Sequence, residues 1–429
     1  MAYCQWMLVV TAGLLVACAP SSASQENITT ELILTSTPVV MTPELSPTPE
    51  PTPRGPARLV LWWPEPLAPF NDRGTASVLA SQISAFEEAQ EAINVELRLK
   101  QARDTGGIME TLRTASAVAP GALPDLTLIQ REDLMAAVQA GLVQPLEGRV
   151  SSAILEDLHA AALALGQVEG QLYGLPYALE VQHLAYHPTE SGGSWRFESL
   201  LARNMSFVFP AHRINGVNDV FLVQYLEAGG ALPEGGAMPI NPDALRDTLA
   251  FYERAVAAGI VDPMVLDYST PVNYQRDLAT GAIPAAIVTS SQYLAMRAEG
   301  QELRFGLIPT ATGQPATILD GWMWVLTTPD VERQAVALEF LDWMMDAERQ
   351  GAYNDMLHML PSQRAALRRL DDPAYARFVE QLLANATLPL TESQVGLVAR
   401  ALQNAFTAVL LGARTAEEAA QDVMNEVGT

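Results

Sequence analysis

Apolar and polar positions near residue 60 follow the period of strands and then of a helix. Residues 58–63 read RLVLWW, an apolar run that predicts a strand. From Thr75 to Ala92 the apolar residues return at helical spacing, and residues 95–99 alternate between apolar and polar as a half-buried strand does. The predicted helix carries one apolar stripe, formed by Leu79, Ile83 and Phe86.

The same alternation continues along the chain. A helix is predicted around 107–119, and 125–129 forms a third apolar strand. This strand–helix–strand–helix–strand order predicts a mainly parallel sheet with helices on both faces. Ligands of such sheets bind beyond the carboxyl ends of the strands, which here are residues 62–65 and 130–131.

Later segments carry clear signals for helix ends. Asn241 followed by Pro242 predicts a helix start, and Gly259 its end. Thr415 and Glu418 have the spacing of a capping box. We also predict a helix that begins at Pro329, with an inward face formed by Ala335, Leu338 and Met345.

The first 56 residues differ from the rest. Met7–Ala17 is an uncharged apolar run, too short to span a bilayer and of the length of a secretory signal core. It ends in Leu-Val-Ala-Cys, which resembles the bacterial lipobox and predicts a signal peptide at 1–17 with lipidation at Cys18. Residues 18–56 are rich in Pro and Thr, which predicts an extended tether without a packed core.

The charge of the chain is strongly acidic, with 25 Lys+Arg against 49 Asp+Glu and a net charge of −24. Four acids and one base lie in residues 1–56, so −21 of this charge belongs to residues 57–429. Such an excess argues against nucleic acid and anionic membrane surfaces as partners. The two cysteines, Cys4 and Cys18, exclude a disulfide framework and a thiolate zinc site in the body.

Signatures of catalysis and cofactor binding are missing from the sequence. It contains no nucleotide-binding glycine motif, no GxSxG and no HExxH. His183 and His187 lie in a predicted strand, where residues four apart are roughly 13 Å from each other, so we predict neither a metal site nor a cofactor. Glu65 and Glu180 are a conceivable glycosidase pair, with plain hydrogen-bond acceptors as the simpler interpretation.

Aromatic residues gather at predicted strand ends and turns. Flat aromatic faces pack against the C–H faces of sugar rings, while carboxylates and amides orient hydroxyl groups. This combination favours a neutral polyol as ligand. The aromatic set consists of Trp62, Trp63, Tyr177, Tyr293, Trp322 and Trp324, of which Trp63 and Trp324 are the candidates for inward-facing structural partners.

From Arg58 to the C-terminus, a series of short segments resembles the carbohydrate-binding, maltose-binding-like group of extracellular solute-binding lipoproteins of ABC importers. Each segment is degenerate alone, but their order is specific. They are the opening LVLWW strand, Pro124-Asp125-Leu126, Tyr173-Gly174-Leu175-Pro176, the segment 277–293, Gly321-Trp322 and Leu360-Pro361-Ser362.

The resemblance implies an α/β, two-lobed periplasmic-binding-protein-like fold of type II. Each lobe is expected to be a mainly parallel sheet flanked by helices, with a hinge of several chain crossings. Lobe 1 is expected to hold 57–180 and 311–368, and lobe 2 to hold 181–310 and 369–429.

The resemblance also implies which residues contact the ligand. Trp62, Tyr293 and Trp322 are expected to stack on it. Hydrogen bonds to it are expected from Glu65, Gln130, Arg131, Glu180 and Gln292. The full expected set is Trp62, Glu65, Gln130, Arg131, Tyr177, Glu180, Ser291, Gln292, Tyr293 and Trp322.

Together these features predict a monomeric, non-enzymatic receptor on the outer face of a bacterial cytoplasmic membrane. It is expected to capture a small neutral solute, a mono- or oligosaccharide, and deliver it to ABC permease subunits. Two alternatives stay open: a receptor that presents its ligand to a sensor, and a secreted glycan-processing enzyme that uses Glu65 and Glu180.

Overall fold

The structure is a computed structural model that describes residues 57–68, 73–190, 192–213, 216–231, 240–390 and 392–427. All of them belong to one compact unit that begins at Arg54. The predicted signal peptide, tether and lipidated Cys18 lie outside the described residues.

The predicted strand–helix order of the N-terminal segment is confirmed. β1 pairs in parallel with β2 along its whole length and with β3 at Leu61 and Trp62. The elements are β1 (Ala57–Pro64), α1 (Arg73–Ala89), β2 (Ile93–Lys100), α2 (Ile108–Val118) and β3 (Leu126–Gln130).

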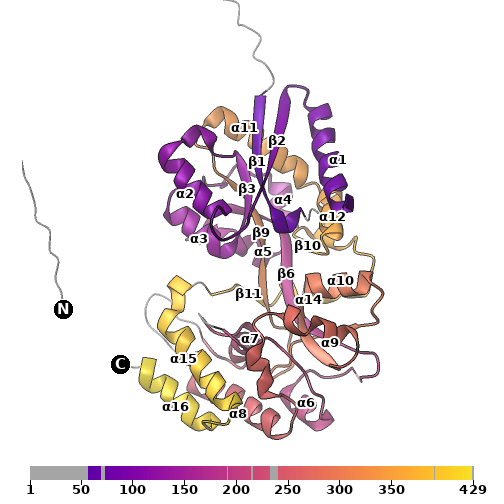
Figure 1. The fold of residues 1–429 in the computed structure, drawn as a ribbon, viewed down its shortest axis with the longest axis vertical. Coiled ribbons are helices and arrows are strands. Elements are labelled where there is room, and N and C mark those ends of the chain that lie inside the picture. The colour runs from indigo at the N-terminus through magenta and orange to yellow at the C-terminus, as the bar shows by residue number, and fades with distance from the viewer. Residues whose placement is uncertain are drawn as a thin grey trace, which may run out of the picture. The chain divides into compact units, whose positions relative to one another are not determined.

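Two long strands, β6 (Gly174–Tyr186) and β9 (Thr317–Leu326), pass through both lobes (Figure 1). At about 3.3 Å per residue, β6 is roughly 40 Å long. Its first half pairs with β10 (Leu360–Pro361), and its second half pairs with β7 (Ala285–Thr289) and β8 (Arg304–Gly306). β6 therefore continues unbroken through the predicted lobe boundary at 180/181.

The two-lobed α/β fold class is confirmed, but the sheet is mixed rather than mainly parallel. Its strand order is β10-β6-β9-β3-β1-β2. β9 runs antiparallel to both β3 and β6, because the chain leaves lobe 1 along β6 and returns along β9.

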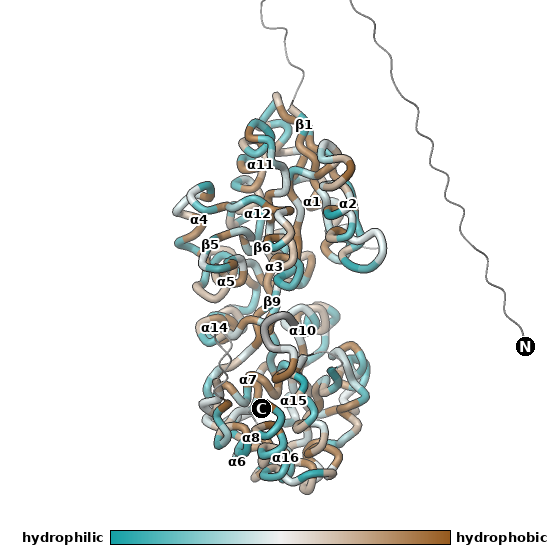
Figure 2. The backbone as a smooth tube through the Cα atoms, turned by 90° about the vertical axis from the view of Figure 1, so that its left-hand side faces the viewer, coloured by the Kyte–Doolittle hydropathy of each residue, from teal (hydrophilic) through white to brown (hydrophobic). Residues whose placement is uncertain are grey.

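Helices and short strands complete each lobe, and Figure 2 shows the two lobes meeting at a waist beside β9. Lobe 1 adds α3 (Arg131–Gln139), α4 (Ser152–Asp157), α5 (Ala160–Leu165), β4 (Gln167–Val168), β5 (Gln171–Leu172), α11 (Val331–Met344), α12 (Ala347–Met356) and α13 (Arg364–Leu367). Lobe 2 adds α6 (Phe197–Arg203), α7 (Asp219–Glu227), α8 (Pro242–Ala257), α9 (Gln275–Ala279), α10 (Ser290–Ala298), α14 (Pro373–Leu383), β11 (Ala386–Thr387), α15 (Glu392–Leu410) and α16 (Ala416–Val427).

The two faces of the crossing strands differ in chemistry. On one face Val181 and Leu319 belong to a single hydrophobic core that extends from Val60 in lobe 1 to Tyr375 in lobe 2. On the other face the cores of the two lobes are separate. Between those two cores lie the polar residues Glu180, Gln182 and Asp320, and a cleft opens on this side of the hinge.

The predicted inward face of α11 is wrong at two of its three positions, while Met345 at the end of the helix is buried as predicted. The helix begins at Val331, after the side chain of Asp330 caps the N–H groups of Glu332 and Arg333. Ala335 is exposed, and Leu338 is only partly buried. The buried residues are Gln334, Ala337, Phe340, Leu341 and Met344, an i, i+3, i+7 stripe in a register that our choice of positions missed.

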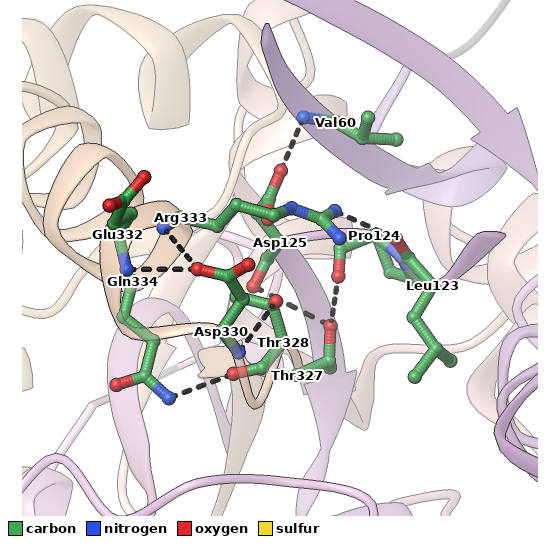
Figure 3. Close-up of polar contacts among 10 residues, drawn as sticks. All are labelled: Val60, Leu123, Pro124, Asp125, Thr327, Thr328, Asp330, Glu332, Arg333 and Gln334. Carbon is green, nitrogen blue, oxygen red and sulfur yellow. Dashed lines mark hydrogen bonds and ion pairs between the residues drawn. The ribbon is translucent and has the colours of Figure 1, made fainter. Parts of the chain in front are cut away.

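A buried ion pair joins α11 to the start of β3 (Figure 3). Asp125 is fully buried, and one of its oxygens accepts from the backbone N–H of Val60 at 2.7 Å. Its other oxygen lies 2.7 Å from Nε of Arg333, and Nη2 of the same guanidinium donates to the carbonyl of Leu123 at 3.1 Å. These contacts hold the far end of lobe 1 together, away from the cleft.

Candidate ligand-binding cleft

A cavity of about 560 Å³ lies between the two lobes, on the polar face of the hinge. Lobe 1, the crossing strands and lobe 2 each contribute to its walls. Its polar lining consists of Arg103, Gln130, Arg131, Glu132, Glu180, Gln182, Arg213, Asp219, Thr289, Asp320 and Arg400.

The floor of the cleft carries two carboxylates on neighbouring strands. Glu180 of β6 is the direct partner of Asp320 of β9 in the antiparallel ladder, so both side chains project from the same face of the sheet. The Ser291 hydroxyl donates to Glu180, and the backbone N–H of Gly321 donates to Asp320 at 2.8 Å. Burial, reinforced by the charges of Glu180 and Asp219, raises the pKa of Asp320 to about 6.

The lobe 2 wall is organised around Asp219, the first residue of α7. The preceding Asn218 caps this helix by accepting from the N–H of Phe221 at 3.0 Å. The Asp219 carboxylate accepts from Nε2 of Gln182 at 3.0 Å and lies 3.5 Å from the Arg213 guanidinium. A carboxylate at this position also interacts favourably with the positive end of the helix dipole.

The lobe 1 wall comes from the end of β3 and the start of α3. One nitrogen of Arg131 donates to three backbone carbonyls at the end of α5, those of Ala164, Leu165 and Gln167, at 2.6–3.2 Å. Burial lowers the pKa of Arg131. Arg103 donates to Gln130 at 3.0 Å and lies 3.5 Å from Glu132, so this wall has its own polar network.

Three of the expected ligand residues line the cavity, namely Gln130, Arg131 and Glu180. Ser291 is not part of the lining but touches Glu180. Gln292 forms a capping box with Thr289 at the start of α10, which occupies its side chain locally. Glu65 lies in a short 3-10 helix outside the lining, so the cavity does not join Glu65 to Glu180.

The expected aromatic platforms do not reach the cavity, and no aromatic residue is part of the described lining. Trp62 is 2% exposed. The ammonium nitrogen of Lys100 lies over its ring, 4.7 Å from the ring centroid. Trp322 follows Asp320 on the same face of β9 but is only 7% exposed.

Tyr177 and Tyr293, two further residues of the expected set, lie in the hydrophobic cores. A bulge between Pro176 and Ala178 turns Tyr177 into lobe 1, where it packs edge-on against Trp324. Tyr293 packs against His183 and Tyr375 in lobe 2, and burial raises its pKa to about 12.

Several residues that line the cavity were not predicted from the sequence. Gln182 follows Glu180 by two positions on a strand, a spacing that places both on one face and would have identified it. Asp320 directly precedes the Gly321-Trp322 segment. Four others come from loops and helices that only tertiary contacts bring to the cleft, namely Arg103, Arg213, Asp219 and Arg400.

The two histidines four apart bond to different parts of lobe 2. His183 is buried and bonds to the Tyr375 hydroxyl, while His187 bonds to the carbonyl of Leu278. Among the described residues, no group of three or more His, Cys, Asp or Glu side chains has the arrangement of a metal centre. The described helices also include none with the length and apolar character of a membrane span.

Comparison with known proteins identifies the family of the chain. Residues 81–377 match the family model described as bacterial extracellular solute-binding protein. The chain belongs to this family. No curated protein sequence matches it.

Solved structures with a similar fold come from several bacteria. The cyclic α-maltosyl-1,6-maltose binding protein of Arthrobacter globiformis shares 16% identity and a TM-score of 0.68, over 87% of this chain and 98% of that chain. The sugar-binding protein MalE of Xanthomonas citri shares 16% identity and a TM-score of 0.68, over 86% and 96%. The maltose-binding protein MalE of Listeria monocytogenes shares 16% identity and a TM-score of 0.66, over 86% and 97%. At these identities the similarity shows the fold.

Proposed function

We propose that this solute-binding protein is the lipid-anchored, extracellular substrate-binding component of an ABC importer. It captures a small neutral solute, a mono- or oligosaccharide, between its lobes. It then delivers the solute to a two-subunit permease that a separate ATPase drives. The protein works as a monomer without a cofactor, and the lipid on Cys18 holds it at the outer face of the cytoplasmic membrane.

The composition of the cleft is the observation that carries this proposal. Four arginines and four carboxylates line the cavity, so its formal charges balance. Two glutamines and Thr289 add further donors and acceptors. Such a lining suits an uncharged ligand rich in hydroxyl groups, and the cavity has the volume typical of small-molecule sites. The fold neighbours named above are called maltose-, maltosyl-maltose- and sugar-binding proteins, which agrees with this class of ligand.

Calorimetry with a panel of sugars tests the ligand class. The full-length chain in detergent is titrated at pH 7.5 with glucose, maltose, maltotriose and cellobiose, and at least one is expected to bind. Glu180→Gln is expected to weaken that binding about tenfold or more, because it removes a charged acceptor from the cleft floor. Glu339→Gln, an exposed change on α11, is the matched control and should leave the affinity unchanged. A tight peptide or polyamine ligand, with no sugar bound, would contradict the proposal.

Cell fractionation tests the anchor. Cys18→Ser removes the proposed lipidation site and is expected to move the protein from the membrane fraction to the medium or the periplasm. Cys4→Ser lies before the proposed cleavage site and should leave the protein in the membrane fraction. Unchanged membrane retention of the Cys18→Ser protein would show that lipidation at this residue is not the anchor.

Uptake measurements separate transport from ligand presentation to a sensor. Deleting the gene should abolish uptake of the radiolabelled sugar that the panel identifies, and the wild-type chain should restore it. Normal uptake in the deletion strain would favour the sensor alternative.

A further inference from the structure

The paired carboxylates at the floor of the cleft have no counter-ion of their own. Among the described residues, no ion pair involves Glu180 or Asp320. Their hydrogen bonds come from the Ser291 hydroxyl and the Gly321 N–H, which are both uncharged donors. Two like charges directly opposite on adjacent strands repel each other.

The neighbouring cations are committed to other partners. Arg131 donates hydrogen bonds to backbone carbonyls at the end of α5. Arg103 donates a hydrogen bond to Gln130 and forms an ion pair with Glu132. Arg213 lies against Asp219, and Nε of Arg400 donates to the carbonyl of Gly396 in α15.

The charge of Arg103 lowers the pKa of Asp320, and Arg131 also interacts with Asp320 through its charge, whereas the charges of Glu180 and Asp219 raise the pKa of Asp320. Asp219 from α7 and Glu132 from α3 line the same cavity. Tyr375 of α14 lies near Glu180 from the opposite face of β6, and burial raises the pKa of its hydroxyl well above its ordinary value. No described histidine lines the cavity. Because burial and the nearby carboxylates raise the pKa of Asp320, protonation of Asp320 relieves the repulsion within the pair when the cleft is empty.

We propose that Glu180 and Asp320 together anchor the hydroxyl groups of the ligand at the cleft floor, and that binding at this pair releases a proton. This inference rests on the proposed function. Sugar hydroxyls donate hydrogen bonds, and an ionised carboxylate accepts them better than a protonated one. The pair is closed off on one side by the continuous apolar core, so the ligand approaches it from the cleft alone.

The sign of the effect follows from the protonation of the free cleft. Because the pKa of Asp320 is raised to about 6, roughly a tenth of the molecules carry it ionised at pH 5.0, and nearly all do at pH 7.5. A ligand that binds the ionised pair should therefore bind about tenfold more weakly at pH 5.0 than at pH 7.5. At pH 6, binding should release roughly half a proton.

Calorimetry of maltose binding to the full-length chain tests this. Affinity is measured at pH 5.0 and 7.5, and the released protons at pH 6 in two buffers of different ionisation enthalpy. Asp320→Asn is expected to bind more weakly at pH 7.5 and to lose the pH dependence. Glu180→Gln is expected to shift the midpoint of the pH dependence downward, because it removes the charge that opposes ionisation of Asp320. Glu339→Gln is the control and should follow the wild type.

The possible results distinguish this inference from the proposed sugar-binding function. Equal maltose affinity at both pH values, or a wild-type pH profile in a folded Asp320→Asn protein, would overturn the inference and leave the sugar-binding function standing. If maltose does not bind at either pH, the same measurements are made with the sugar of the panel that binds, and a panel in which no sugar binds counts against both. Circular dichroism shows whether Asp320→Asn folds. If it does not, the test is the pH midpoint of maltose affinity in Glu180→Gln. A midpoint equal to that of the wild type would overturn the inference.

Discussion

Single residues in this protein owe their behaviour to the strand face on which they lie. His183 and Gln182 are neighbours in β6, yet Gln182 faces the cleft and His183 is fully buried. The imidazole contacts the rings of Tyr293, Tyr375 and Phe378 and bonds to the Tyr375 hydroxyl at 3.0 Å. Burial lowers its pKa to about 4, so the ring is neutral in the folded protein at ordinary pH.

This buried histidine makes stability depend on pH. Its pKa is about 4 when folded and about 6.5 when unfolded, so the unfolded state binds the proton more tightly. Stability is therefore expected to be full above pH 6.5 and to fall as the pH drops toward 4, by on the order of 3 kcal/mol. Urea unfolding of wild type and His183→Gln between pH 4 and 8 measures the difference. The exposed His212→Gln is the control, and equal slopes in all three proteins would contradict this account.

At the scale of elements, the hinge depends on how closely β6 and β9 approach. A Cβ atom on Gly321 would overlap the backbone carbonyl oxygen of Ala178 on the neighbouring strand. This residue stands next to Asp320 and opposite Leu179, so the close approach also sets the position of the carboxylate pair.

Replacing this glycine should therefore separate the crossing strands. Gly321→Ala is expected to cost about 1–3 kcal/mol of unfolding free energy, because backbone cannot move aside as a flexible side chain can. Gly121→Ala is the matched control, since nothing lies within 4 Å of a Cβ there. Denaturant unfolding of both proteins measures the effect. A Gly321→Ala protein as stable as the control would show that the strands have room to spare.

The contact between α11 and β3 gives a second prediction at this scale. Arg333→Met removes the cation that pairs with the fully buried Asp125. Leaving a buried charge without its partner is expected to cost about 3–5 kcal/mol. Arg246→Met breaks only exposed ion pairs, with Asp243, Asp247 and Glu417, and should cost about 1 kcal/mol or less. Chemical denaturation compares the two proteins, and similar losses would mean that the buried pair contributes no more than a surface one.

At the scale of the whole molecule, the hinge is apolar on one side and polar on the other. The apolar core behind β6 and β9 joins the lobes, whereas the polar side holds the cavity. Such an arrangement suits a motion in which the lobes close over the cleft while the core behind the strands stays packed, and ligand binding then favours the closed state.

Closure gives a prediction about dimensions in solution. Adding saturating maltose to the full-length chain at pH 7.5 is expected to reduce its radius of gyration, measured by small-angle X-ray scattering. Glu180→Gln should show a smaller reduction at the same maltose concentration, because less of it is bound. An unchanged radius of gyration in the maltose-saturated wild type would mean that the lobes do not close on this ligand.

Local patterns in the sequence determined most elements and their order. Strand and helix periods predicted β1 to β3, and the signals at Asn241 and at Thr415 with Glu418 predicted two helix starts that the structure confirms. These features depend on residues close in the chain, which is why sequence alone reveals them. The register of α11 escaped this reasoning, because several of its faces carry apolar residues and only packing against lobe 1 selects one.

The composition of the cleft was decided by the tertiary structure. The pairing of Glu180 with Asp320 joins strands far apart in the chain, and the bulge at Pro176 hides Tyr177 in lobe 1. Trp62 and Trp322 are of the residue type that stacks on sugar rings, but both side chains are buried. The sequence by itself determined the elements through local pattern, and it predicted the two-lobed solute-binding fold through the resemblance of its ordered segments to a known family. Which side chains meet the ligand depends on strand register and packing, which arise only when distant segments come together.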